Sequence, residues 1–299
     1  MLDFSEITLK DKLYFDSLLK LYNPEISELT FTNLYMWRNI YKFRFTEICG
    51  LLCIVSAPEK GEPFAFMPIG RLQKDTFIEA FDCLKKYFSN NNWQLIFKRV
   101  PESELAYFTG YEEVVKEVAF DDDNSDYVYL TSDLIQLKGK KFDGKRNHIN
   151  RFKRQYDYDY VVLDESHIDE CLRITLEWCA ERDCDSHWEL YSEKMANIEL
   201  LDNFKALGCK GALIRVNGRF EAFTAGDMLN KDTAVIHIEK ANSKLNGLYT
   251  FINQQFCENE WKHTNYINRE QDLGLYGLKK AKMSYNPVKM SKKYSVLIK

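Results

Sequence analysis

GALIRVNGRFEAFTAG, residues 211–226, has the pattern of two strands joined by a tight turn. The turn is Asn217-Gly218, because these residues readily adopt the positive φ angles of a type I′ hairpin. TAVIHIE, residues 233–239, continues the alternating pattern and extends the hairpin to a three-strand meander. Helical periodicity follows at 247–261, and then the short run NYIN at 265–268. A meander, a crossover helix and a further strand together predict an α/β domain with a mixed sheet.

The same order of elements occurs twice along the chain. In the first half we expect helices near 8–22 and 28–39, strands near 41–47, 50–55 and 63–69, a helix near 76–90, a strand at 93–100, a short helix at 101–108 and a strand at 127–132. In the second half we expect a strand at 156–165, helices near 166–182 and 192–207, the meander with its crossover helix, a short helix near 275–283 and a closing strand at 293–298. This recurrence predicts two tandem domains, residues 1–135 and 136–299. Each resembles the acyl-CoA N-acyltransferase-like (GNAT-like) fold, a mixed α+β sheet within the α/β class.

Composition narrows the class of protein. The chain has 299 residues and a net charge of −4, which argues against a protein that coats nucleic acid generally. We expect a cytoplasmic location, because no run of about 18 apolar residues or secretory signal is present. The eight cysteines lie mostly at apolar positions, so we expect reduced, buried thiols. Cys179, Cys184 and His187 match metal-ligand spacing only loosely, and the acidic run at 121–126 fits no calcium loop, so no metal is predicted.

Two polar strand ends are predicted to converge on one crevice in the second half. The strand 233–239 and the strand after the crossover helix should be parallel neighbours, and ligands bind where such strands separate at their carboxyl ends. Those ends are HIEKAN (237–242) and NREQD (268–272). Strict alternation would put His237 and Glu239 on one face, where they could orient or deprotonate a substrate. A buried structural His–carboxylate pair is the alternative for these two residues, and an elaborate turn is the alternative for 268–272.

A weaker motif lies at the start of the crossover helix. Lys244-x-x-Gly247-x-Tyr249 looks like a degraded form of the acyltransferase pyrophosphate motif Arg/Gln-x-x-Gly-x-Gly/Ala. A helix N-terminus can bind phosphate through free N–H groups. Tyr249, however, stands where a small residue is needed, and an ordinary helix cap explains the glycine equally well.

The segment joining the two halves is strongly basic. From Lys138 to Arg154 there are eight Lys or Arg residues and one acid, Asp143. We expect a helix over 144–155 that could bind a phosphate-rich partner, such as a tRNA acceptor stem or an anionic lipid headgroup at a membrane surface. The residues predicted to bind phosphate on it are Lys145, Arg146, Asn147, His148 and Arg151. The alternative is a solvated basic face.

Three stretches resemble a known family. GKKFDGKRNHINRFK (139–153), VIHIEKAN (235–242) and NREQDLGLYGLKKAKMSYNPVKM (268–290) are similar to a bacterial family grouped with the C-terminal domain of phosphatidylglycerol lysyltransferase. More distantly, they resemble the Fem-type aminoacyltransferases. The resemblance implies two GNAT-like domains and transfer of an acyl or aminoacyl group to an amine or hydroxyl. In those enzymes the donor is aminoacyl-tRNA.

The resulting hypothesis is an aminoacyl-tRNA-dependent transferase that needs no protein nucleophile. Positioning and stabilisation of charge would carry the reaction. The predicted catalytic residues are His237, Glu239, Asn268, Glu270 and Asp272. Besides the basic helix, the predicted substrate- or phosphate-binding residues are Lys240, Lys244, Gly247, Arg269, Lys279, Lys282 and Tyr285. The alternatives are an N-acyltransferase that uses a coenzyme A thioester, and a non-catalytic module that binds RNA or an anionic headgroup.

Overall fold

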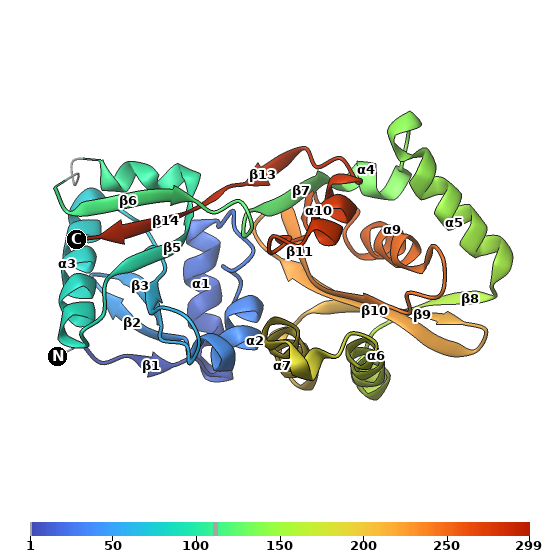
Figure 1. Ribbon diagram of the computed structural model, residues 1–299, viewed down its shortest axis with the longest axis horizontal. Helices are drawn as coiled ribbons and strands as arrows, with labels where there is room; N and C mark the ends of the chain where they lie inside the picture. The colour runs from blue at the N-terminus through green and yellow to red at the C-terminus, as the bar shows by residue number, and fades with distance from the viewer. Residues whose placement is uncertain (1, 110–112) are drawn as a thin grey trace.

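Two mixed sheets, each with its own helices, lie side by side along an elongated molecule (Figure 1). The computed structural model describes residues 2–109 and 113–299. Within these residues each sheet has seven strands, in the orders β1-β2-β3-β4-β5-β14-β6 and β13-β7-β12-β11-β10-β9-β8. The predicted α/β class with mixed sheets is therefore confirmed.

The first sheet is built mainly from the first half of the chain. Its strands are β1 (Ser5–Glu6), β2 (Arg44–Ile48), β3 (Leu51–Ser56), β4 (Phe64–Ala65), β5 (Ile96–Pro101), β14 (Lys293–Ile298) and β6 (Val115–Phe120). Its helices are α1 (Lys12–Tyr22), α2 (Phe31–Tyr41) and α3 (Lys74–Asn90), with 3₁₀ turns η1 (Leu9–Asp11) and η2 (Glu102–Phe108). Helix α3, predicted near 76–90, buries an apolar stripe of Phe77, Ala80, Phe81, Leu84 and Phe88 against this sheet.

The second sheet carries the predicted site. Its strands are β13 (Lys289–Ser291), β7 (Asp126–Leu130), β12 (Tyr266–Asn268), β11 (Thr233–Ala241), β10 (Arg219–Met228), β9 (Lys210–Val216) and β8 (Tyr158–Val162). The longer helices are α5 (Asp143–Gln155), α6 (Ile168–Ala180), α7 (Trp188–Asp202) and α9 (Leu248–Glu260). The shorter ones are α4 (Thr131–Gln136), α8 (Phe204–Leu207), α10 (Tyr276–Met283), η3 (Lys140–Phe142), η4 (Glu165–His167) and η5 (Cys184–Ser186). Figure 1 shows α6 and α7 on one face and α9 on the other.

The two sheets exchange strands. The order of elements predicts that residues 127–132 close the first half and residues 293–298 close the second. Instead, β7 pairs with β12 and β13 in the second sheet, and β14 lies between β5 and β6 in the first. The second sheet is therefore built from the continuous segment 126–291, whereas the first combines residues 5–120 with the closing strand 293–298, and a boundary near residue 135 stays a prediction. No helix in the described part of the chain is both long and apolar enough to span a membrane.

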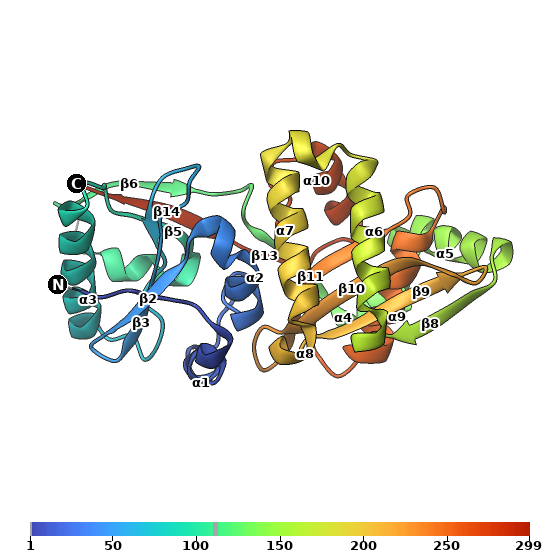
Figure 2. The same ribbon diagram turned by 90° about the horizontal axis from the view of Figure 1, so that it is seen from below.

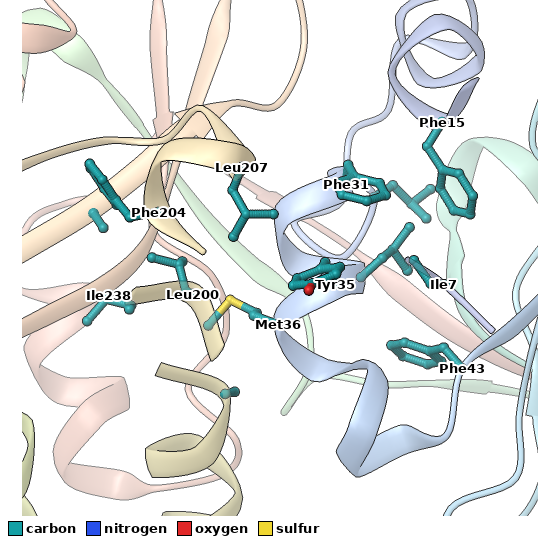
Figure 3. Packing of buried hydrophobic residues seen from close by; sticks show 14 of the residues in the cluster. Ile7, Phe15, Phe31, Tyr35, Met36, Phe43, Leu200, Phe204, Leu207 and Ile238 are labelled. Carbon is teal, nitrogen blue, oxygen red and sulfur yellow. The ribbon is translucent and has the colours of Figure 1, made fainter. Parts of the chain in front are cut away.

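One hydrophobic core runs across the boundary between the sheets. Helix α2 of the first half packs against α7 of the second (Figure 2). Figure 3 shows Tyr35 and Met36 of α2 facing Leu200 and Leu207, and these side chains belong to one buried cluster. Because the cluster draws on both halves, their separation would expose a large apolar area to water.

A buried ionic network lies beside this shared core. Lys293 of β14 is fully buried, and its Nζ lies 2.6 Å from both Asp126 Oδ1 and Glu28 Oε2. Glu28 also pairs with Arg99 at 3.0 Å. Asp126 accepts hydrogen bonds from the backbone N–H of Ser27 at 2.7 Å. The exchanged strands thus bring their charges to the loop before α2, where each charge depends on its partner for compensation.

A β-bulge in β11 adds a second polar contact between the halves. Ala225 and Gly226 of β10 pair with Ile238 and Ile236, so His237 is the extra residue. A Cβ on Gly226 would come within 2.2 Å of the Val235 carbonyl oxygen, so glycine permits the close approach at the bulge.

The bulge turns His237 toward the first half. Its Nδ1 lies 2.9 Å from Glu270 Oε1 and its Nε2 3.1 Å from Asp227 Oδ1. Around these groups, Asn33 Nδ2 donates to Glu270 at 3.2 Å, and Thr32 Oγ1 donates to Asp227 at 2.6 Å. Burial alone would lower the pKa of His237, but Asp227 and Glu270 outweigh it and raise the pKa to about 10. We call His237, Asp227 and Glu270 the junction clamp.

Loss of Lys293 should destabilise the protein strongly. Lys293→Met leaves Asp126 without its buried cation and Glu28 with Arg99 alone, so we expect a loss of about 3–5 kcal/mol in the free energy of unfolding. Lys292→Met is the matched control, because the neighbouring Lys292 is half-exposed and pairs only with Glu102 at the surface. Urea unfolding of the three proteins measures the difference. Equal losses for the two variants would contradict the buried network.

The junction clamp should make stability depend on pH in one direction. Because folding raises the pKa of His237 from 6.5 to about 10, the stabilisation is complete below pH 6.5 and is lost as the pH rises toward 10. We expect the advantage of wild type over His237→Gln to shrink across that window, measured as urea midpoints at successive pH values. His263→Gln, at an exposed histidine, is the control. A constant advantage from pH 6.5 to 10 would show that the clamp is not charged.

Candidate active site

The candidate site begins where two parallel strands separate. β11 and β12 pair in parallel at Thr233–Tyr266, Ala234–Ile267 and Val235–Asn268, and the ladder ends there. The structure thus has the parallel neighbours expected from the crossover helix. Beyond the last pair, Glu239 of β11 forms an ion pair with Arg269, which follows β12. We call the polar side chains gathered around this ion pair the crevice.

Three side chains form the floor of the crevice. Arg269 Nη2 donates to Glu239 Oε1 at 2.9 Å, and Asn253 Nδ2 of α9 donates to Glu239 Oε2 at 3.0 Å. Glu239 and Arg269 are each only 13% exposed. Burial disfavours the charged guanidinium, but Glu239 outweighs this effect and raises the pKa of Arg269. The carboxylate therefore holds a guanidinium on one side and an amide on the other.

This floor contains an unused donor and an unused acceptor. Among the residues that the structure describes, Arg269 Nη1 and Asn253 Oδ1 are buried without a hydrogen-bond partner. The amide orientation of Asn253 follows from chemistry, because only its nitrogen can donate to Glu239. Buried polar atoms are rarely left unpaired, since each costs about 1–3 kcal/mol. The pair therefore leaves one donor and one acceptor of this buried group without a protein partner.

Two tyrosines and two lysines complete the walls. The Arg269 guanidinium lies 4.7 Å from the centre of the Tyr285 ring, and Lys145 Nζ of α5 lies 3.7 Å from the same centre. Tyr129 donates to the Lys282 carbonyl at 2.9 Å, and Lys282 Nζ donates to the Arg269 carbonyl. Burial, reinforced by Arg269, lowers the pKa of Lys145 and of Lys282 to about 8. Three basic side chains, Arg269, Lys145 and Lys282, thus lie near Glu239, and Glu270 and Asp126 also act on Lys282.

The bulge separates residues that the sequence places together. Alternation predicts one face for His237 and Glu239, yet Ile236 packs in the α9-side cluster and Ile238 in the cluster shared with α7. The extra residue shifts the alternation, so Glu239 meets α9 while His237 enters the junction clamp. With both ring nitrogens facing carboxylates and a pKa of about 10, the His237 imidazole is protonated at neutral pH and has no free lone pair for a substrate proton.

The predicted wall 268–272 is divided in the same way. Only Arg269 enters the crevice, while Glu270 belongs to the clamp. Asn268 is fully buried, donates to Asp126 at 3.0 Å and accepts from the Glu270 N–H at 2.8 Å. Asp272 accepts from Tyr127 and from the Gly274 N–H, which shapes the turn before α10. These carboxylates and amides have structural partners, as the turn alternative expects.

The predicted basic helix is α5, and it supplies one crevice residue, Lys145. Arg146 instead donates to the carbonyls of Leu137 and Gly139 behind α4 and pairs with Asp143. Three further predicted residues are exposed along the helix, namely Asn147, His148 and Arg151. The helix also crosses the start of α9: a Cβ on Gly247 would lie 2.4 Å from the His148 carbonyl oxygen.

The degraded coenzyme A motif does not form an open phosphate site. Gly247 is packed against α5, and Lys244 pairs with Glu181 of the α6 end at 2.8 Å. Tyr249 accepts a hydrogen bond from Trp178 at 3.1 Å. These contacts do not fit a coenzyme A pyrophosphate, because the N-terminus of α9 is covered and its nearby cation faces a carboxylate.

Two other predicted lysines lie outside the crevice. Lys240 is buried toward α6 and α7, where its Nζ lies 2.5 Å from Glu193 and 3.3 Å from the centre of the Trp178 ring. Lys279 is on the exposed side of α10 and pairs with Asp122 at 2.7 Å. Adjacent residues on a strand or a helix point in different directions. This explains why the side chain of Lys240 lies toward α6 and α7 while that of its neighbour Glu239 lies in the crevice.

The first half differs in what lies beside its parallel strands. There β4 and β5 are parallel at Ala65–Phe97, but the space beside them is filled with aromatic rings. Phe97 lies 5.5 Å from Phe108, and Phe77 also lies 5.5 Å from Phe108, between ring centres. The polar groups of this half lie toward the end of β5, where Arg99 pairs with Glu28 at 3.0 Å and with Asp121 at 2.9 Å.

Asn253 and Asp227 were not among the site residues predicted from the sequence. Asn253 is a buried polar residue on a helix face that otherwise presents Leu248, Phe251, Ile252 and Phe256. Such an isolated amide was a usable signal, because an apolar face tolerates it only with partners. Asp227 gave no comparable signal, since its role depends on contacts with the distant α2.

Comparisons with known proteins agree with this architecture. A conserved protein of unknown function from Bacteroides thetaiotaomicron has 35% identity, full coverage of both chains and a TM-score of 0.94. L-PGS from Bacillus licheniformis has 16% identity, covers 99% of this chain and 94% of that one, and has a TM-score of 0.67. A tandem GNAT protein from the clavulanic acid biosynthesis pathway has 9% identity, 99% and 98% coverage and a TM-score of 0.51. The prediction of two GNAT-like halves is confirmed.

The sequence comparisons lead to a family. An uncharacterized protein of Mycoplasmoides gallisepticum is 24% identical over 181 residues, which span 58% of this chain and only 56% of that relative. The family described as "Phosphatidylglycerol lysyltransferase, C-terminal" matches residues 19–297. With its two GNAT-like halves and a match over nearly its whole length, the chain belongs to the phosphatidylglycerol lysyltransferase C-terminal family.

Proposed function

We propose that this protein transfers an aminoacyl group from aminoacyl-tRNA to an amine or hydroxyl acceptor bound in the crevice. Membership of the lysyltransferase family supports the reaction class. The observation that carries the proposal is the unused pair beside Glu239, the donor Arg269 Nη1 and the acceptor Asn253 Oδ1. An ester carbonyl and an attacking amine or hydroxyl need those two partners.

The chemistry follows from these positions. The acceptor nitrogen or oxygen donates a hydrogen bond to Asn253 Oδ1, which directs its lone pair toward the ester carbonyl. As the new bond forms, negative charge develops on the carbonyl oxygen, and Arg269 Nη1 donates to it. The tetrahedral intermediate then expels the ribose oxygen, which takes up the proton lost by the acceptor. Glu239 holds both residues in place, so positioning replaces covalent catalysis.

The surrounding charge suits an anionic donor. Lys145, Lys282 and Arg269 give the crevice a positive balance over Glu239. Exposed basic residues continue along α5 from Lys145 to Arg151 and Arg154. In this proposal the tRNA phosphates lie along α5 and the aminoacyl end enters beside Lys145.

Two alternatives make different predictions. The coenzyme A alternative is weakened, because the start of α9 is covered by α5. A non-catalytic module that binds RNA through α5 would use the basic helix, but Arg269 and Asn253 would then bind neither donor nor acceptor. Catalysis and binding must therefore be measured separately.

Arg269→Gln should lower the rate of transfer far more than it weakens donor binding. Removal of one donor to a developing oxyanion costs about 10²–10³-fold in kcat. The assay follows release of radiolabel from a mixed pool of aminoacyl-tRNA, with a small-molecule and lipid extract as the acceptor source. Asn253→Ala should show a smaller loss of the same kind. This second variant tests the same site independently, in case Arg269→Gln fails to fold.

Lys244→Gln is the matched control for this assay. Lys244 is exposed, pairs with Glu181 and lies outside the crevice, so we expect no change in rate. Transfer that survives Arg269→Gln, or that is lost with Lys244→Gln, would contradict the assignment. Calorimetric titration with acetyl-coenzyme A tests the other donor, and no binding is expected.

Replacement of the exposed arginines of α5 should weaken donor binding in a salt-dependent way. For Arg151→Gln/Arg154→Gln, we expect the slope of log affinity against log salt for tRNA to fall by about 2, since each phosphate contact contributes nearly one unit. Lys205→Gln, at an exposed residue of α8 that pairs with Glu165, is the control. An unchanged slope would mean that α5 is only a solvated basic face.

A further inference from the structure

Lys145 stands apart from the other lysines of the basic segment. Its Nζ lies 3.7 Å from the centre of the Tyr285 ring, the same ring that Arg269 contacts at 4.7 Å. Within the described residues, no carboxylate forms an ion pair with Lys145, whereas Lys141 pairs with Asp133 at 2.9 Å. Lys282 also lies beside Arg269, but its Nζ donates a hydrogen bond to the Arg269 carbonyl. Lys145 therefore presents an amine beside the proposed reacting atoms with no competing ion pair.

The surroundings also favour the reactive form of this amine. Burial, followed by the repulsion of Arg269, lowers the pKa of Lys145 to about 8, although Glu239 opposes the shift. A large fraction of the side chain is then neutral slightly above neutral pH, in contrast to an exposed lysine with a pKa near 10.4. Only a neutral amine has the lone pair needed to attack a carbonyl.

We propose that Lys145 is a site of Nε-acylation, an internal acceptor that takes the acyl group when the crevice holds a donor but no external acceptor. This inference rests on the proposed aminoacyl transfer. The Lys145 nitrogen attacks the ester carbonyl carbon and forms a C–N bond, while Arg269 stabilises the oxyanion. The C–O bond to the ribose then breaks, and the ribose oxygen takes the proton that leaves the nitrogen. The products are an amide on Lys145 and deacylated tRNA.

Acylation of Lys145 would lower the activity of the enzyme itself. The amide is neutral, so the crevice loses one of its three basic side chains and the attraction for an anionic donor weakens. The added group also lies at the Tyr285 ring, where the aminoacyl end is proposed to enter. Modified protein should therefore bind donor less tightly and transfer more slowly until an unmodified copy replaces it.

Reactivity toward a simple activated ester tests the amine without any tRNA. Brief treatment with N-hydroxysuccinimidyl acetate at pH 8, followed by peptide mass spectrometry, gives the acetylation rate of each lysine. We expect Lys145 to react about tenfold faster than Lys153, an exposed lysine on the same helix, because much more of it is neutral. The rate should rise with pH to a plateau above 8. A rate equal to that of Lys153 would overturn the inference.

The enzymatic test uses the full chain and radiolabelled aminoacyl-tRNA with acceptor omitted. We expect one aminoacyl adduct that maps to Lys145 and is absent from Lys145→Arg, which keeps the charge but not the nucleophile. Transfer to an external acceptor without any adduct on Lys145 would overturn this inference alone. Absence of both transfer and adduct would overturn the proposed function, and the activated-ester rates would then still decide whether Lys145 is the reactive amine.

Discussion

The β-bulge at His237 is the constraint on which the functional part of the structure depends. It exists because Gly226 allows β10 to approach the Val235 carbonyl, where any side chain would collide. The extra residue shifts the alternation of β11, so that Glu239 faces α9 and His237 faces the first half of the chain. One short strand thereby serves two purposes, a polar crevice on one side and a charged link between the halves on the other.

The charged link and the shared apolar core explain why the two halves act as one body. His237 sits between Asp227 and Glu270, while Lys293 sits between Asp126 and Glu28. Each cation is buried with two carboxylates, so its removal would leave uncompensated charge inside the protein. The strand exchange brings β14 and β7 to these positions. It also holds β12, and with it Arg269, at a defined place relative to β11.

Much of the fold could be predicted from the sequence because it depends on local patterns. The hairpin turn, the apolar stripe of α3 and the crossover helix each leave a periodic signal, and together they gave the parallel strands and the position of the crevice. The strand exchange left no such signal. The strands 126–130 and 293–298 are both short and apolar, and either sheet could bury them. The bulge also escaped prediction, because HIE reads as regular alternation and the disturbance comes from Gly226 on another strand.

The candidate site was predicted in part, because the local patterns located the ends of the two parallel strands but not the directions of their side chains. Glu239, Arg269, Lys145, Lys282 and Tyr285 come from separate stretches, and the structure brings them together. Asn268, Glu270 and Asp272 were grouped with them by sequence proximity, yet their side chains complete the turn and the junction. The distinction depends on side-chain direction after a bulge, which composition and spacing do not encode.

The most direct measurement is a crystal structure with a stable donor mimic, an adenosine that carries an amino acid through a 3′-amide in place of the ester. The carbonyl oxygen of the amide should lie within hydrogen-bond distance of Arg269 Nη1, with the adenosine toward α5 and the junction clamp unchanged. Density for the mimic beside His237, or at the start of α9 with Arg269 and Asn253 still unpaired, would contradict the assignment of the crevice as the site of transfer.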